Sequence, residues 1–175
     1  MKQITIAKSA GFCFGVNRAI NIVNSLLDKN VKVSTLGPII HNMEVVNELE
    51  SRGCKAVSSI DEVEKDATLV IRSHGVPKYV IDKLDENGVK YEDATCPFVK
   101  KIHNIVANPD NKDGIVLIAG NSVHPEVEGI IGHCSTECHT FKNSEEIDEI
   151  YNIILKKNNK QVFVVAQTTF DTKEW

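Results

Sequence analysis

Residues 114–126 read Gly-Ile-Val-Leu-Ile-Ala-Gly-Asn-Ser-Val-His-Pro-Glu, an apolar run that passes through a small polar loop into a helix start. The apolar run Gly114–Ala119 is typical of a strand buried on both faces, as in parallel sheets. Pro125 suits the first position of a helix, because the N–H that proline lacks would have no partner there. The stretch therefore predicts a β-strand, a short loop and an α-helix.

The same alternation extends along the whole chain. Further strands are predicted at Ile4–Ala7, Val31–Leu36, Thr68–Arg72 and Gln161–Ala166, with weaker patterns at Lys90–Asp93 and Glu137–Phe141. Amphipathic helices are predicted at Val16–Asp28, Met43–Arg52, Lys78–Glu86, Phe98–Val106, Glu126–Ile131 and Glu145–Lys156. Alternating strands and helices form βαβ units around parallel sheets, so the predicted fold class is α/β.

The length of 175 residues suits one sizeable domain or two small α/β units. We place a boundary near residue 97, with a first α/β domain over residues 10–96 and a second over residues 97–175. The polar segment 108–114 is expected to be a surface loop. No helix pattern follows the last predicted strand, so we expect a truncated protein or one without its last domain.

The composition indicates a globular protein, with 42% hydrophobic and 25% charged residues. A formal net charge of −4 excludes the strongly basic surface of a nucleic-acid-binding chain. No apolar run approaches the roughly 18 residues of a membrane span, and no secretory signal is recognisable. We therefore expect a cytoplasmic protein without a nucleic-acid or membrane partner. We also expect a monomer.

Three of the predicted strand ends are followed by a histidine, namely His41, His74 and His124. Ligands of parallel sheets bind at the carboxyl ends of the strands, so these side chains can converge on one cleft. Two chemistries fit three histidines: a metal site, or an anion pocket in which imidazole N–H groups act with helix N-termini. The glycine and serine residues of the same loops favour a phosphate or diphosphate pocket, because they let backbone N–H groups approach a ligand.

Polar residues near the same strand ends are further candidates. Glu126, at a helix start, either complements the helix dipole or points into the histidine cleft as a proton donor or relay. Thr168 and Thr169 follow the last predicted strand and either cap a turn or offer hydroxyl groups to the cleft. Structural roles are assigned to the remaining histidines, His103, His133 and His139.

Cys13 and Cys96 each lie at a predicted helix start, flanked by glycine or proline. Near a helix N-terminus the dipole favours the thiolate, which is the form that ligates metal. Glycine and proline neighbours are also typical of iron–sulfur ligands. These two cysteines are therefore candidate metal ligands.

The other three cysteines have other interpretations. An odd number of cysteines in a chain without a secretory signal does not indicate a disulfide framework. Cys134 and Cys138 lie four residues apart beside His133 and His139, which leaves a small zinc site open. Cys54 is interpreted as a small residue that fills the core.

Six short motifs occur in a fixed order along the chain. They are Gly-Phe-Cys-Phe-Gly-Val at 11–16, Ile-His-Asn at 40–42, Ser-His-Gly-Val at 73–76, Asp-Ala-Thr-Cys-Pro at 93–97, Gly-Asn-Ser-Val-His-Pro-Glu-Val-Glu-Gly at 120–129 and Gln-Thr-Thr at 167–169. Together they resemble the 4-hydroxy-3-methylbut-2-enyl diphosphate reductase family, the iron–sulfur oxidoreductases that end the methylerythritol phosphate pathway of isoprenoid biosynthesis. The resemblance covers nearly the whole chain.

The resemblance implies a trefoil of three similar α/β domains around a central cluster, each domain supplying one cysteine. Cys13 and Cys96 match the first two cysteine positions, and the third is absent from this sequence. Residues 1–9 match a strand that pairs with the third domain of the family. That third domain also supplies serine and asparagine groups to the diphosphate pocket.

The resemblance also implies the reaction, a reductive dehydroxylation that gives isopentenyl and dimethylallyl diphosphates. His41, His74 and His124, with Thr168 and Thr169, match the substrate-binding residues, while Glu126 and Thr168 match the catalytic ones. The implied cofactor is a [4Fe-4S] cluster, or a [3Fe-4S] cluster if it is degraded. Ferredoxin or flavodoxin is the implied electron donor.

With two of the three cysteines, we expect the 175-residue chain alone to hold little cluster and to turn over negligibly. The alternative is a non-catalytic fragment that binds diphosphate and lacks a stable cluster.

Overall fold

The computed structural model describes residues 3–7, 10–108, 114–155, 161–171 and 173. Lys2, Lys156 and residues 109–113 of the predicted surface loop lie outside these ranges. None of the described helices is long and apolar enough to cross a membrane.

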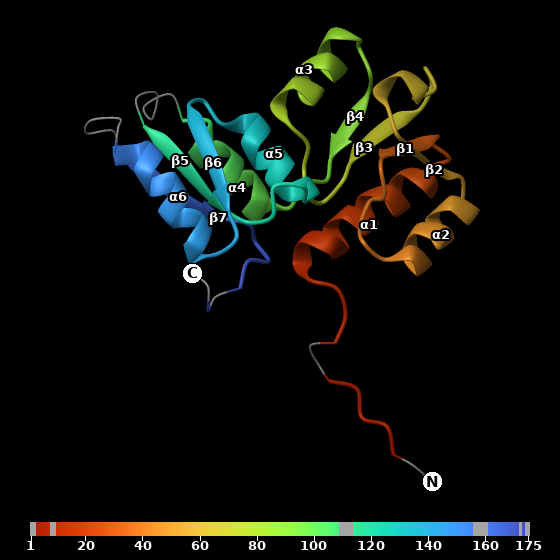
Figure 1. Ribbon diagram of the computed structural model, residues 1–175. Helices are drawn as coiled ribbons and strands as arrows, with labels where there is room; N and C mark the ends of the chain where they lie inside the picture. The colour runs from red at the N-terminus through yellow and green to blue at the C-terminus, as the bar shows by residue number, and fades with distance from the viewer. Residues whose placement is uncertain (1–2, 8–9, 109–113, 156–160, 172, 174–175) are drawn as a thin grey trace.

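Helices and strands alternate along the chain, which confirms the predicted α/β class (Figure 1). In order, the elements are α1 (Phe14–Leu27), β1 (Val33–Leu36), α2 (Met43–Ser51), β2 (Cys54–Val57), the 3-10 helix η1 (Ile60–Glu62), β3 (Thr68–Ile71), α3 (Lys78–Glu86), β4 (Tyr91–Asp93), α4 (Pro97–Val106), β5 (Ile115–Ala119), α5 (Pro125–His133), β6 (Glu137–Phe141), α6 (Ser144–Leu155) and β7 (Val162–Ala166).

The strands form two separate parallel sheets. The four-stranded sheet has the order β2-β1-β3-β4, and the three-stranded sheet has the order β6-β5-β7. Because neighbouring strands run in the same direction, β1 and β3 end at one edge of the first sheet. β5 and β7 likewise end together at one edge of the second.

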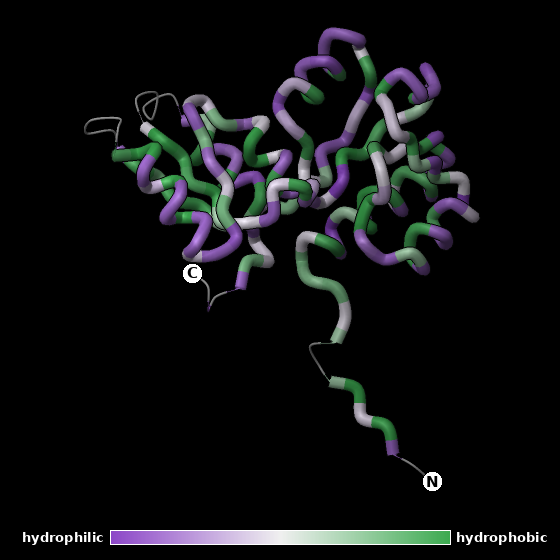
Figure 2. The backbone as a smooth tube through the Cα atoms, in the orientation of Figure 1, coloured by the Kyte–Doolittle hydropathy of each residue, from purple (hydrophilic) through white to green (hydrophobic). Residues whose placement is uncertain are grey.

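Helices cover both faces of each sheet. On β3, Val70 packs with α1 and α2, whereas its neighbours Leu69 and Ile71 pack with α3 and η1. In the second sheet, Ile118 packs with α4 and α5, and Leu117 packs with α6. Figure 2 shows the result as apolar colour along the central strand β5 and polar colour on the outer turn of α3.

Two strands differ from the sequence prediction. The prediction of a strand at Ile4–Ala7 is wrong, because residues 3–7 are exposed and make no ladder with another strand (Figure 1). Strand β2 was not predicted, because its four residues do not alternate: the end residues Cys54 and Val57 are buried and the two between them are exposed. The other predicted strands and helices are present, with ends shifted by a few residues at most.

We propose that the boundary between the two units lies at residue 97, where α4 begins. Strand β4 ends at Asp93 in the first sheet, and the next strand, β5, belongs to the second sheet. Helix α4 packs through Ile102 and Val106 into the same apolar cluster as α5. Residues 10–96 and 97–175 are then the two α/β units.

Candidate functional site

The loops that follow β1, β3 and β5 bring His41, His74 and His124 together, and we call these three residues the histidine cluster. The ring centroids of His41 and His74 lie 4.5 Å apart, those of His74 and His124 5.5 Å, and those of His41 and His124 5.8 Å. One ring nitrogen from each residue lies within 4.8 Å of the other two. Residues from both sheets therefore line one site.

Two helices begin at the cluster. His41 precedes Asn42, the N-cap of α2, whose side chain accepts a hydrogen bond of 3.0 Å from the N–H of Val45. His124 is itself the N-cap of α5, and its Nδ1 accepts a hydrogen bond of 3.1 Å from the N–H of Glu126. Helix N-termini carry partial positive charge, so both helices favour an anion at this position.

The geometry and the pKa shifts favour neutral rings at His74 and His124. Because Nδ1 of His124 accepts a hydrogen bond, the ring proton lies on Nε2. Burial, helped by His41, His124 and Arg72, lowers the pKa of His74 to about 4. Burial also lowers the pKa of His124, and His41 and Arg72 add to this effect while Glu126 opposes it. The rings can therefore donate N–H groups to an anion or lone pairs to a metal ion.

The charge around the cluster favours an anion over a metal ion. Nδ1 of His74 is buried and has no hydrogen-bond partner among the described residues, so either kind of ligand could use it. Arg72, directly after β3, lies close enough to lower the pKa values of His74 and His124 by its charge. A permanent cation beside two positive helix ends repels a metal ion and attracts phosphate oxygens.

A buried carboxylate adjoins the cluster. The side chain of Glu126, on α5, is only 2% exposed. The backbone N–H of Thr168 donates to its Oε1 at 2.6 Å, and the Thr168 hydroxyl donates to its Oε2 at 2.8 Å. Glu126 is thus connected to His124 by its own N–H and to the turn after β7 by its carboxylate.

Thr169 is placed differently from Thr168. Its hydroxyl oxygen accepts a hydrogen bond of 2.8 Å from Nε2 of Gln167. Oε1 of Gln167 accepts a hydrogen bond from the N–H of Asn121, which follows β5. Gln167 therefore ties together the loops after β5 and β7, and the Thr169 hydroxyl is bound to Gln167.

Cys13 and Cys96 lie at the starts of two neighbouring helices, as the N-caps of α1 and α4. A Cβ atom added to Gly15 would lie 2.5 Å from Sγ of Cys96, so this thiol contacts the first turn of α1. The N–H of Cys96 donates to the carbonyl of Ser73, the residue before His74. The second cysteine therefore lies between the helix that begins after Cys13 and the loop of the histidine cluster.

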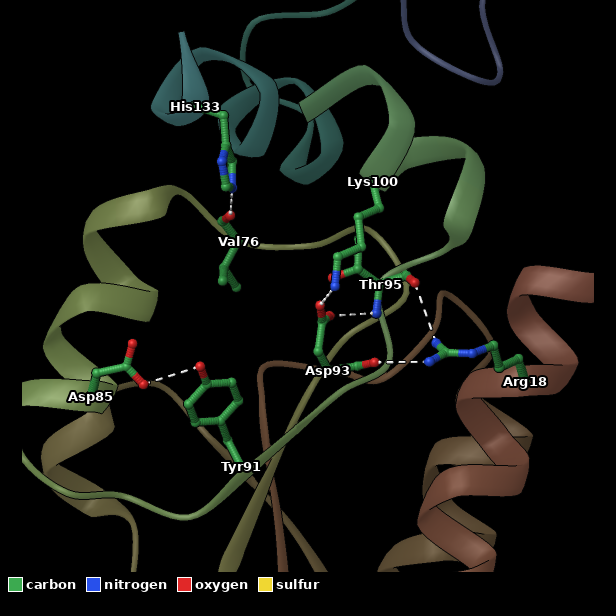
Figure 3. Close-up of polar contacts among 8 residues, drawn as sticks. All are labelled: Arg18, Val76, Asp85, Tyr91, Asp93, Thr95, Lys100 and His133. Atoms are coloured by element: carbon green, nitrogen blue, oxygen red, sulfur yellow. Dashed lines mark hydrogen bonds and ion pairs between the residues drawn. The ribbon is translucent and has the colours of Figure 1, made fainter. Parts of the chain in front are cut away.

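Arg18 fixes α1 against the segment that leads to Cys96 (Figure 3). Its guanidinium donates to the carbonyls of Asp93 at 3.1 Å and Thr95 at 3.3 Å. The Asp93 carboxylate accepts a bond from the N–H of Thr95 and pairs with Lys100 at 2.6 Å. Burial raises the pKa of Asp93, but the bonds from Lys100 and Thr95 outweigh it and the pKa is lowered.

The donor set of Cys13 and Cys96 fits an iron–sulfur cluster. Neither thiol makes a capping hydrogen bond to its helix, and both lie at positive helix ends. Thiolates are the ligands that iron–sulfur clusters use. These two residues could therefore hold such a cluster beside the histidine cluster.

The zinc site at Cys134 and Cys138 is not supported. Among the residues that the structure describes, the three histidines of the cluster are the one group of potential ligands that lie mutually within 4.8 Å. The thiol of Cys134 donates to the carbonyl oxygen of Ile130 at 3.4 Å. The interaction between the two thiols lowers the pKa of Cys138 and raises that of Cys134. Cys54 lies in β2 and is 6% exposed. Burial raises the pKa of its thiol to about 11, so the side chain stays neutral, as expected of a core residue.

Four residues near the site were not singled out from the sequence for it, namely Arg18, Arg72, Gln167 and His103. Arg72 and Gln167 each follow a strand directly, which is the signal that could have identified them. Arg18 acts from within a helix, where no local pattern distinguishes it. His103 lies on α4 and stacks on His133 at a centroid distance of 4.1 Å.

Comparisons with known proteins identify a family for this chain. The family described as LytB protein matches residues 4–175. Two similar proteins are named 4-hydroxy-3-methylbut-2-enyl diphosphate reductase. The one from Clostridioides difficile is 40% identical over 97% of this chain, and the one from Alkaliphilus oremlandii is 42% identical over 97%.

Solved structures give the same result. A structure of (E)-4-hydroxy-3-methyl-but-2-enyl diphosphate reductase superposes with a TM-score of 0.81 and 38% identity, covering 97% of this chain and 59% of that one. The reductase of Plasmodium falciparum gives a TM-score of 0.82 and 29% identity, covering 95% of this chain and 52% of that one. The chain spans about 60% of the length of the two relatives it matches in sequence.

Replacing Thr168 by valine should lower the free energy of unfolding by about 1–3 kcal/mol, because Oε2 of the buried Glu126 then loses its hydrogen-bond donor. Thr168→Ser keeps the hydroxyl and should retain most of the stability. Urea unfolding monitored by circular dichroism measures both variants. Equal stability of the valine and serine variants would show that the hydroxyl does not support Glu126.

Lowering the pH from about 7 to about 4.5 should destabilise the chain. Burial lowers the pKa of both His74 and His103 to about 4 in the folded chain, whereas an unfolded histidine titrates near 6.5. The unfolded state binds protons first, so stability present above about pH 6.5 is lost toward pH 4. The loss is up to about 3 kcal/mol for His103 and less for the more exposed His74, whose charge is partly screened by solvent.

Urea unfolding at constant ionic strength measures this dependence, and His103→Phe is the control. Because phenylalanine does not titrate, the variant should lose stability less steeply with falling pH. The same slope in both proteins would contradict the assignment of a neutral buried ring to His103.

Proposed function

This chain belongs to the LytB protein family, and we propose on that basis that it provides the diphosphate-binding and proton-donating groups of a 4-hydroxy-3-methylbut-2-enyl diphosphate reductase. The reaction replaces a C–OH group by C–H, consumes two electrons and two protons, and releases water. The products are isopentenyl and dimethylallyl diphosphates. One observation carries the proposal: three imidazoles from three strand ends meet beside the buried Glu126.

The histidine cluster holds the diphosphate group in this proposal. Each ring can direct an N–H group at a phosphate oxygen, and the N-termini of α2 and α5 add their partial charges. Arg72 supplies a permanent positive charge near two of the rings. Binding the diphosphate here fixes the rest of the substrate relative to α5, which carries Glu126.

Glu126 and Thr168 supply the proton to the departing hydroxyl group. The hydrogen bond between Thr168 Oγ1 and Glu126 Oε2 is a path along which a proton can move between carboxyl and hydroxyl. The second bond, from the N–H of Thr168 to Oε1, holds the carboxyl group in one orientation. Burial of Glu126 keeps water from competing for that proton. Thr169, bound to Gln167, supports the same turn beside the substrate.

Cys13 and Cys96 hold the iron–sulfur cofactor, of the [4Fe-4S] type or [3Fe-4S] when degraded. When bound, the cluster supplies electrons and a Lewis-acidic iron. The part of these residues is to present two thiolates at adjacent helix starts, with Arg18 holding α1 against the segment before Cys96. We propose a one-electron carrier of the ferredoxin or flavodoxin class as the electron donor, acting on a monomer in the cytoplasm.

Binding of inorganic pyrophosphate, measured by isothermal titration calorimetry at neutral pH, tests the anion site. His41→Ala and His124→Ala should each weaken binding about tenfold or more, because each removes a hydrogen bond to a charged ligand worth about 1.5–3 kcal/mol. His139→Ala is the matched control, since His139 lies on β6 and bonds Glu137 outside the cluster. Absence of binding, or equal loss in the control, would refute the proposal for the cluster.

Iron content after anaerobic reconstitution with iron and sulfide tests the two thiols. The iron content per chain should be lower in Cys13→Ser and in Cys96→Ser than in the native chain, because each substitution removes a thiolate ligand. Cys54→Ala is the control, since Cys54 is buried in β2. Iron that is unaffected by both serine variants would leave a diphosphate-binding module without a cluster, and pyrophosphate binding that survives iron chelation would support that alternative.

A further inference from the structure

Helix α5 packs directly against the loop that follows β3, and glycines make this close approach possible. A Cβ atom on Gly132 would lie 2.7 Å from Cα of Pro77, and one on Gly129 would lie 3.6 Å from the carbonyl oxygen of His74. The loop contains His74, while α5 begins with His124 and Glu126. This contact between the two units therefore lies within a few residues of the histidine cluster.

The imidazole of His103 occupies the centre of this contact. The side chain is 5% exposed and comes from α4. A Cβ atom on Gly75 would lie 2.7 Å from its Cε1, and one on Gly129 would lie 3.2 Å from its Nε2. The edge of the ring is thus inserted between the residue that follows His74 and the face of α5.

A second histidine completes the contact. His133, at the end of α5, stacks on His103 with an interplanar angle of 17°. Its Nε2 lies 3.1 Å from the carbonyl oxygen of Val76, two residues after His74 (Figure 3). The stacked pair therefore contacts the His74 loop at Gly75 and Val76 and contacts α5 at Gly129.

Stability alone does not account for a histidine at position 103. Its Nε2 is buried and has no hydrogen-bond partner among the described residues. A buried polar atom without a partner lowers stability, and an apolar ring of similar shape would avoid that cost. The position therefore calls for an explanation beyond core packing.

We propose that His103 is a positioning residue for the anion site: its ring, held between Gly75 and Gly129, sets the distance between the His74 loop and the helix that carries His124 and Glu126. This inference rests on the proposed function, since it concerns how the same site is assembled. The ring centroids of His74 and His124 lie 5.5 Å apart and come from different units. Hydrogen bonds to one ligand tolerate only a few tenths of an ångström, so the spacing between units decides whether both rings reach it.

The test compares His103→Ala with His103→Phe. The alanine variant leaves the slot between the glycines empty and should weaken pyrophosphate binding about tenfold, while the phenylalanine variant refills it and should stay within about threefold of the native chain. In the ligand-free chain, the nuclear Overhauser effect between the ring protons of His74 and His124 should weaken in the alanine variant and persist in the phenylalanine variant. Urea unfolding shows that each variant is folded.

A double-mutant cycle with Gly129→Ala tests the contact itself. The added methyl meets the His103 ring, so Gly129→Ala should weaken pyrophosphate binding about threefold in the native chain and not at all in the His103→Ala background. Gly132→Ala is the matched control, because its methyl meets Pro77. It should weaken binding in both backgrounds, because removing the His103 ring does not relieve the contact with Pro77.

Three results would overturn the inference. The first is that His103→Ala changes neither the pyrophosphate affinity nor the ring-proton signal. The second is that Gly129→Ala and His103→Ala weaken pyrophosphate binding additively. The third is that His103→Ala restores the pyrophosphate binding lost in Gly132→Ala. If the native chain binds pyrophosphate through His41 and His124 while these results are obtained, the proposed function stands and the role of His103 fails. If the native chain does not bind pyrophosphate, the proposed function fails, and the ring-proton signal still decides whether His103 sets the spacing.

Discussion

The close contact between α5 and the loop after β3 is the constraint on which the rest of the site depends. Each sheet can place its own loops, since the carboxyl ends of parallel strands lie at one edge. Neither sheet can place the loops of the other. Gly129 and Gly132 let the helix approach the loop at backbone distance, and this approach brings the histidine from β5 to the histidines from β1 and β3.

Most of the fold could be predicted from the sequence, because each long element has its own local signal. The apolar run at 115–119 forms β5 and is buried throughout, and Pro97 and Pro125 begin α4 and α5. The failures concern short segments whose structure depends on neighbours. Strand β2 is defined by pairing with β1, and residues 3–7 have an apolar pattern but no described strand beside them.

The sequence predicts which residues belong to the candidate site better than it predicts the contacts between them. Histidines at three strand ends are visible in the sequence, and so is Glu126 at a helix start. The bond between Glu126 and Thr168 joins residues 42 positions apart, and that between Arg18 and Thr95 joins residues 77 apart. No local pattern encodes such pairs. The same reason explains why His103 received only a structural role, since its importance comes from what lies on either side of its ring.

The hydrogen bond from the Glu126 amide to Nδ1 of His124 has a consequence for which ligands the site accepts. It fixes the tautomer, so the free nitrogen of that ring carries hydrogen and presents no lone pair. Compounds that offer acceptor oxygens are matched at this point, whereas an ammonium group would set one N–H against another. The direction of this one hydrogen bond thus makes the site select against amines at the His124 ring, independently of the charge or shape of the ligand.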